Sequence, residues 1–266
     1  MRESLAVILG SAYQKRLPAK LELEKIEVET KWGSQTVFRL KESGRPAYIL
    51  FRHGLPHKWL PHQIPYRAQA AALQKLGCKA LVVTSSVGVM NADLPLFKPL
   101  LLSDLIMLEN RLPDGSACTM FNEYSPGQGH LVLSEGLFSR ALTRQLYNLA
   151  PEVMESPETE VIFAYAGGPR SKTPAENRLW PKLGADVNSM TLAPEVVLAN
   201  ELEIPCAGLV VGHKYSIPGI NNPENYNTVT ETLDKSREAM EWIVIKFLKE
   251  GQSIPFGNHI YRYNEK

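Results

Sequence analysis

Small hydroxyl side chains, an arginine and a histidine follow several apolar segments of this sequence. Ser11 follows the first apolar run, Arg52 and His53 follow the second, and Ser85 and Ser86 follow the third. Hydroxyls, backbone N–H groups and a guanidinium that donates to two oxygens are the groups that bind a phosphate dianion. Their recurrence indicates an anion site, although each residue taken alone also fits an ordinary turn, a surface charge or a packed imidazole.

Met190 and Thr191 add another hydroxyl immediately before an expected helix N-terminus. The spacing of these residues is not that of a known nucleotide-binding loop. The sequence contains no GxxxxGK[ST] motif, and no GxGxxG motif follows the first apolar run. The sequence therefore lacks the motifs that usually indicate nucleotide hydrolysis or dinucleotide binding.

The apolar runs at residues 5–9, 47–51 and 80–84 predict buried strands. Each run is continuous, which is typical of strands covered on both faces in a parallel sheet. Residues 66–76 are alanine-rich and amphipathic, and Gly77 follows them as a helix C-cap would. This order of elements is the βαβ pattern, in which ligands bind beyond the carboxyl ends of the strands.

The second half of the chain continues the pattern. Residues 160–165 and 206–211 predict further strands, and residues 173–183 and 194–202 predict helices that begin near a proline. Residues 228–250 predict a long amphipathic helix, which we expect to pack at the edge of the sheet.

Composition limits the fold and the classes of function. The 266 residues include 29 basic and 28 acidic side chains. The sequence therefore lacks the excess of positive charge that is typical of proteins that bind nucleic acids or anionic membranes. No apolar run approaches ~18 residues, and three cysteines without CxxC spacing argue against a disulfide framework or a zinc site. We expect a soluble, cytoplasmic protein that binds neither nucleic acid nor membrane. Its fold class should be α/β, a single domain over residues 1–266 with a mixed, mostly parallel twisted sheet flanked by helices.

Four motifs occur in order between about residue 5 and about residue 216. They are ILGS at 8–11, RHGLPH at 52–57, LGCKALVVTSSVG at 76–88, and a long segment at 168–199. The last contains GPRSKTPAE followed by GADVNSMTLAPEV, which is similar to the pattern GP-x-x-x-T-x-AE … GAD-x-x-x-M-[ST]-x-x-PE-V. Together these motifs resemble the trimeric purine nucleoside phosphorylase and methylthioadenosine phosphorylase family.

The resemblance implies a phosphorolytic enzyme with a nucleoside phosphorylase-like fold. In that reaction inorganic phosphate, as co-substrate and without a cofactor or metal, attacks C1′ of a nucleoside and releases a purine base and a pentose 1-phosphate. Carried over by position, the residues that would hold phosphate are Ser11, Arg52, His53, Ser85, Ser86 and Thr191. Met190 would pack under the ribose, and His57 would line the 5′ side of the nucleoside.

The resemblance also implies a homotrimer or a dimer of trimers, in which a loop of the adjacent subunit completes the cleft. Residues 108–129 form a long segment rich in proline and glycine, which is more often functional or interfacial than inert. This insertion, together with His130, is our candidate for that loop.

The base-binding segment departs from the family pattern. By alignment, the two aspartate positions of methylthioadenosine phosphorylases fall on Lys214 and Ser216, and the asparagine position of 6-oxopurine enzymes falls on His213. Ser171 replaces the aromatic residue that stacks on the base, and Lys172 replaces a base-reading glutamate.

Three functions stay open at this point. In the first, His213 or Lys214 donates to N7 or O6 of a 6-oxopurine, since a lysine or a charged histidine favours a carbonyl over an amino group. The substrate would then be inosine-, guanosine- or methylthioinosine-like. In the second, the protein acts on another N-glycoside. In the third, a catalytically weak paralogue binds a nucleoside or sugar phosphate or serves as an interaction subunit. Independently of these three, His213 and Lys214 could simply point into solvent after a strand end.

Overall fold

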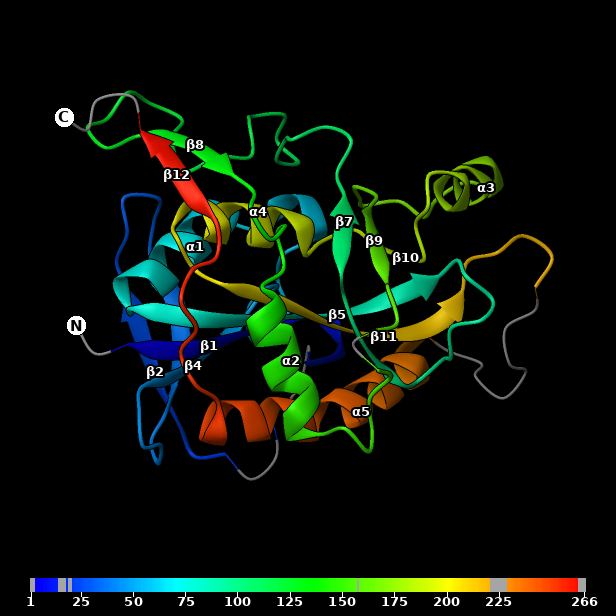
Figure 1. Ribbon diagram of the computed structural model, residues 1–266, viewed down its shortest axis with the longest axis horizontal. Coiled ribbons are helices and arrows are strands. Elements are labelled where there is room, and N and C mark those ends of the chain that lie inside the picture. Colours follow the sequence, from blue (N-terminus) through cyan, green and yellow to red (C-terminus); the bar gives the residue numbers. More distant parts are fainter. Residues whose placement is uncertain (1–2, 14–17, 19–20, 157, 221–228, 263–266) are drawn as a thin grey trace.

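The strands of the computed structural model, which describes residues 3–13, 18, 21–156, 158–220 and 229–262, form one large sheet (Figure 1). Ten strands pair in the order β2-β3-β4-β1-β5-β10-β9-β7, with β11 beside β5 and β6 beside β11. They are β1 (Ser4–Leu9), β2 (Leu23–Val28), β3 (Gln35–Leu40), β4 (Ala47–Phe51), β5 (Cys78–Val89), β6 (Pro99–Leu101), β7 (Asp104–Ile106), β9 (Ile162–Tyr165), β10 (Val187–Ser189) and β11 (Cys206–Tyr215). A separate pair consists of β8 (Gly129–Val132) and β12 (His259–Arg262).

Helices cover both faces of the sheet, and none of the described ones is long and apolar enough to cross a membrane. The helical segments are η1 (Ser11–Tyr13), η2 (Pro61–Gln63), α1 (Tyr66–Lys75), α2 (Arg140–Leu149), α3 (Pro174–Lys182), α4 (Ala193–Glu201) and α5 (Val229–Glu250). α1 and α4 pack on one face, whereas α2 and α5 pack on the other. The expected α/β class with a mixed, mostly parallel sheet is confirmed.

Alternation along β1 divides the core into these two layers. Ala6 and Ile8 belong to the cluster under α1 and α4, whereas Leu5, Val7 and Leu9 belong to the cluster under α2 and α5. Successive side chains of a strand point to opposite faces, so a continuous apolar run fills both layers at once. The prediction of a strand buried on both faces is thereby confirmed.

The last helix differs from its expected position. Its expected first residue, 228, lies outside the described residues, and α5 covers a face of the sheet rather than the edge. Met240, Ile243, Val244 and Phe247 share one apolar stripe that packs against β1, β4, β5 and β11. An amphipathic stripe of this width buries more apolar area against a face than against an edge.

Two strands extend further than their apolar runs predicted. β5 continues through Ser85 and Ser86 to Val89, and β11 continues through His213 and Lys214. The two strands pair in parallel over this extra length, and hydrogen bonding between them overrides the weaker apolar pattern. The serines and the His213–Lys214 pair therefore lie within strands, and the expectation that they follow strand ends was wrong.

A gap in the sheet lies along one side of β5. β1 pairs with β5 in parallel only as far as Val83, and β10 pairs with it in antiparallel from Gly88 onward. Because β11 occupies the opposite side of β5 over this stretch, β1 and β10 approach from the same side. Residues 84–87 therefore have no partner strand there among the described residues. The carboxyl ends of β1 and β10 point toward each other across this gap.

A buried ion pair fills part of the gap. The Arg52 guanidinium, just after β4, donates from Nη1 to the carbonyl oxygen of Thr84 at 2.9 Å. Its Nε and Nη2 donate to the two carboxylate oxygens of Glu195 in the first turn of α4, the latter at 2.8 Å. Both side chains are 1% exposed. The guanidinium thus takes the place of a strand partner and links β4, β5 and α4.

We predict that Glu195→Gln lowers the free energy of unfolding by about 3–5 kcal/mol, because it leaves the buried Arg52 without its counter-charge. Replacing both partners with apolar residues (Arg52→Met with Glu195→Leu) should restore most of that loss. The control is Glu24→Gln, which breaks an exposed pair with Arg39 and should cost about 1 kcal/mol or less. Chemical denaturation followed by circular dichroism measures all three. A Glu195→Gln protein as stable as the wild type would contradict this account.

Candidate active site

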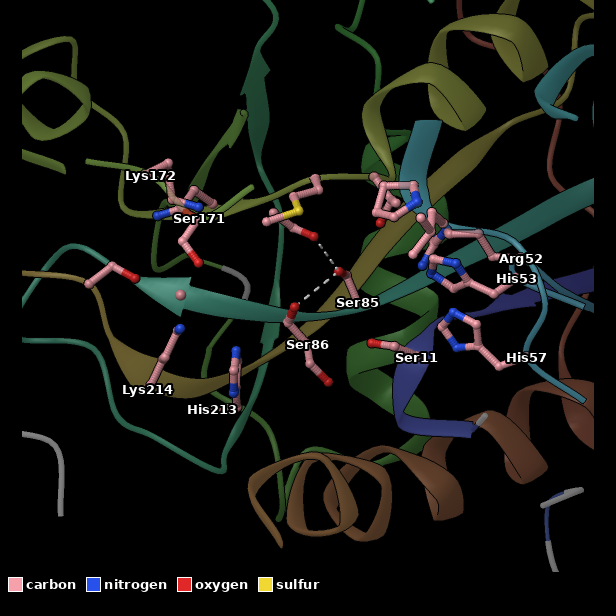
Figure 2. A pocket seen from close by; sticks show the side chains of 18 of the residues that line it. Ser11, Arg52, His53, His57, Ser85, Ser86, Ser171, Lys172, His213 and Lys214 are labelled. Carbon is pink, nitrogen blue, oxygen red and sulfur yellow. Dashed lines mark hydrogen bonds between the residues drawn. The ribbon is translucent and has the colours of Figure 1, made fainter. Parts of the chain in front are cut away.

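A cavity of about 340 Å³ opens at the gap in the sheet (Figure 2). Nearly all of the residues that the sequence analysis selected contribute to its wall. These are Ser11, Arg52, His53, His57, Ser85, Ser86, Ser171, Met190, Thr191, His213, Lys214 and Ser216. Segments that are up to about two hundred positions apart in the chain therefore meet at one site.

The cavity has two ends, which Figure 2 shows on either side of Ser85 and Ser86. Ser11, Arg52, His53 and His57 lie at one end. Ser171, Lys172, His213 and Lys214 lie at the other. The expected division into a phosphate and ribose side and a base side thus corresponds to a spatial separation along β5.

His130 is the one selected residue that does not line this cavity. It lies in β8, pairs with Tyr261 of β12, and its ring is 5.3 Å from the Tyr261 ring. Figure 1 shows the β8–β12 pair far from the end of β5 that carries the cavity. His130 therefore does not line the cavity of its own chain, and its contribution to the cavity of a neighbouring subunit stays a prediction.

Hydroxyl groups form the centre of the cavity wall. Ser85 Oγ lies 3.1 Å from Ser189 Oγ, across the gap between β5 and β10. Ser86 Oγ is buried and has no hydrogen-bond partner among the described residues. A buried hydroxyl without a partner is costly, so an anion that accepts from it would relieve that cost.

Arg52 can offer a phosphate only part of its guanidinium. Of the five N–H donors, two engage Glu195 and one engages the carbonyl of Thr84. Two N–H groups remain for a ligand. The prediction that Arg52 donates in parallel to two phosphate oxygens is compatible with this count, but the fork formed by Nε and Nη2 is already occupied.

His53 is held as a neutral ring. Its Nδ1 lies 2.7 Å from the carbonyl oxygen of Trp59, which can only accept, so Nδ1 carries the proton. Burial, with a smaller contribution from Arg52, lowers the pKa of His53 to about 3. The His57 ring stacks on it with centroids 4.3 Å apart. His53 Nε2 therefore presents a lone pair, suited to accept from a hydroxyl of phosphate or ribose.

A β-bulge positions His213 at the other end of the cavity. The pairing register between β11 and β5 shifts between Gly212 and Lys214, and bulges of this kind re-aim a side chain. His213 Nδ1 lies 3.2 Å from Thr232 Oγ1 of α5. Burial, followed by repulsion from Lys214 and Lys172, lowers the pKa of His213 to about 4. His213 is thus neutral at pH 7, and the alternative that it acts as a charged donor was wrong.

Positive charge gathers around the cavity. Lys172 and Lys214 line one end and Arg52 the other, whereas no aspartate or glutamate is among the described residues that line it. Burial lowers the pKa of Lys172, and Lys214 lowers it further by repulsion. A cavity with this lining favours ligands that carry negative charge or present acceptors.

Several lining residues were not selected from the sequence. They are Leu60, Pro61, Lys172, Gly88, Asn177, Asn188 and Ser189. Lys172 was noted only as a departure from the family pattern. Asn188 and Ser189 occupy variable positions of the GAD-x-x-x-M motif, so the motif could not select them, and their contribution follows from the pairing of β10 with β5.

The lowered pKa of His213 predicts a pH effect on stability. The unfolded chain protonates this ring near pH 6.5 but the folded chain only near pH 4, so the unfolded state binds more protons between those values. Stability should therefore rise from pH 4 to pH 6.5, and His213→Asn should make this rise shallower. Unfolding free energies at several pH values measure the slope. Identical slopes in the two proteins would exclude a buried neutral His213.

Comparison with known proteins agrees with this geometry. A family model described as the phosphorylase superfamily matches residues 4–249. The chain is 31% identical to a probable S-methyl-5′-thioinosine phosphorylase of Methanopyrus kandleri, covering 94% of this chain and 95% of that protein. It is 30% identical to a probable 6-oxopurine nucleoside phosphorylase of Thermococcus kodakarensis, over 92% and 91% of the two chains.

A solved structure shares the fold. Methylthioadenosine phosphorylase from Schistosoma mansoni in complex with tubercidin superposes with a TM-score of 0.78 at 22% identity, covering 93% of this chain and 90% of that one. The order of strands, the cavity at the gap in the sheet and the match over residues 4–249 lead to one conclusion: the chain belongs to the phosphorylase superfamily.

Proposed function

We propose that this protein is a purine nucleoside phosphorylase that acts on a 6-oxopurine nucleoside, such as inosine, guanosine or methylthioinosine. The observation that carries the proposal is the cavity itself, where hydroxyls and Arg52 occupy one end and two lysines the other. The names of the two relatives that match over most of the chain support the same class of substrate.

Phosphate binds at the end formed by Ser11, Arg52, Ser85, Ser86 and Thr191. The unpartnered Ser86 Oγ and the two remaining N–H groups of Arg52 supply donors to its oxygens. A phosphate oxygen then forms a bond to C1′ of the pentose while the C1′–N9 bond breaks. The electron pair of that bond moves into the purine, which takes up a proton and leaves as the free base.

The base side stabilises the leaving purine. Lys214 or Lys172 donates to O6 or N7, where negative charge develops as the C1′–N9 bond breaks. Neutral His213 assists as an N–H donor rather than as a cation. An ammonium group has donors only, so it attracts the carbonyl of a 6-oxopurine and repels the amino group of adenine. We therefore expect the enzyme to prefer 6-oxopurine nucleosides over adenine nucleosides.

We also propose that the chain works as one phosphorylase-like domain in the cytoplasm and that it assembles as a homotrimer or dimer of trimers. Its three cysteines are buried free thiols, which suits a reducing compartment. Leu60, which lines the open side of the cavity, is 48% exposed. A neighbouring subunit that covered this side would exclude water from the reacting groups.

A nucleoside panel tests the proposal. We expect release of free base and formation of pentose 1-phosphate from inosine and methylthioinosine only when phosphate is present, with kcat/KM at least tenfold above that for adenosine. Ser86→Ala should raise the KM for phosphate by roughly tenfold or more, since it removes a hydrogen bond to a charged ligand. Ser134→Ala, at an exposed serine outside the cavity, is the matched control and should leave that KM unchanged.

Two outcomes would contradict the proposal. Base release without phosphate would indicate a hydrolase. Failure to consume any nucleoside, while phosphate still raises the melting temperature, would indicate a paralogue that binds its ligands without turnover.

A further inference from the structure

Asn188 carries a buried amide that nothing in the described protein satisfies. It lies in β10, lines the cavity and is 1% exposed. Neither Oδ1 nor Nδ2 has a hydrogen-bond partner among the described residues. Gln69, another buried amide, leaves only Oε1 without a partner because its Nε2 donates to the carbonyl of Arg52. The complete lack of partners at Asn188 therefore needs a separate explanation.

The pairing of strands places this amide and Lys214 on one face of the sheet, on either side of β5. Asn188 of β10 and Lys214 of β11 are both in register with Gly88 of β5. Residues in register on neighbouring strands point to the same face. Because Gly88 between them has no side chain, the two flank a slot above Gly88.

Ser216 currently covers this slot. A Cβ built on Gly88 would come close to Ser216 Oγ and would lie 3.4 Å from Asn188 Oδ1. The Ser216 hydroxyl makes no hydrogen bond with a described residue, so its rotation away from Gly88 breaks no bond. A flat ring that entered the slot would displace this hydroxyl and reach the amide.

The slot lies farther along β5 than the serines of the proposed phosphate end. Gly88 is two residues beyond Ser86 along β5, which is about 7 Å in a strand. In the proposed reaction phosphate attacks C1′ from the side opposite N9, so the six-membered ring of the purine extends away from the phosphate end. The amide therefore faces the position of the base rather than that of phosphate or ribose.

We propose that Asn188 reads the six-membered ring of the purine and is a specificity-determining residue of this enzyme. Its Oδ1 accepts the N1–H of a 6-oxopurine and its Nδ2 donates to O6, while Lys214 donates from the other side of the slot to O6 or N7. This inference rests on the proposed function and deepens it. In 6-oxopurine enzymes the asparagine that reads the base aligns with His213 of β11. Here we assign the corresponding role to Asn188 of β10.

The test pairs one variant with a substrate that lacks both groups that Asn188 is proposed to read. Purine riboside lacks both O6 and the N1 proton of inosine and is the smaller of the two. Asn188→Leu should lower kcat/KM for inosine by about 10- to 100-fold, since two hydrogen bonds are lost. It should change kcat/KM for purine riboside less than threefold and leave the KM for phosphate unchanged. Asn148→Leu, at an exposed asparagine of α2, is the matched control and should change none of these values.

Stability provides a second readout. Asn188→Leu removes an unpartnered buried amide, so its melting temperature without ligands should equal or exceed that of the wild type. Binding of the free bases, hypoxanthine against purine, should show the same selective loss by calorimetry.

The inference is overturned if the variant lowers kcat/KM equally for both nucleosides, if neither changes, or if the ligand-free variant melts well below the wild type. Each of these results leaves phosphorolysis of inosine by the wild type intact. Failure of the wild-type protein to release hypoxanthine with phosphate would instead reject the proposed function.

Discussion

Within the described part of the chain, no strand pairs with one side of β5 from residue 84 to residue 87, and the site depends on how that side is filled. β1 and β10 approach it from opposite directions and stop short of each other. Arg52 enters the space and binds the carbonyl of Thr84, which would otherwise be left without a partner. A cation buried in this way requires a counter-charge, and Glu195 supplies it. One ion pair thus holds β4, β5 and α4 in the arrangement that forms the cavity.

The charge distribution in the cavity suits a reaction with an anion at both ends. Phosphate enters as a nucleophile, and the purine leaves with the electron pair of the broken bond. We propose that Arg52 binds the first and that Lys172 and Lys214 stabilise the second; no carboxylate is among the described lining residues. Burial keeps His53 and His213 neutral, so both rings act through hydrogen bonds rather than through charge.

The cavity contains buried polar groups that the described protein leaves without hydrogen bonds and that a ligand could satisfy. Ser86 Oγ and the amide of Asn188 are buried and find no partner among the residues that the structure describes, and β11 contains a bulge at His213. Such departures concentrate at functional sites, because groups that must bind a ligand cannot also be satisfied by the protein. The same residues lie in the cavity that the family motifs predict, so energetic and sequence arguments agree on its location.

The sequence by itself determined the α/β class, most elements and most of the residues that line the cavity, because apolar periodicity and the GAD-x-x-x-M motif are local signals. It misplaced the ends of β5 and β11, since polar residues at 85–86 and 213–214 remain in strands only through pairing between those two strands. It also could not select Asn188 or assign the neutral state of His213. Both depend on long-range register and on burial among side chains distant in the chain, which only the tertiary structure decides.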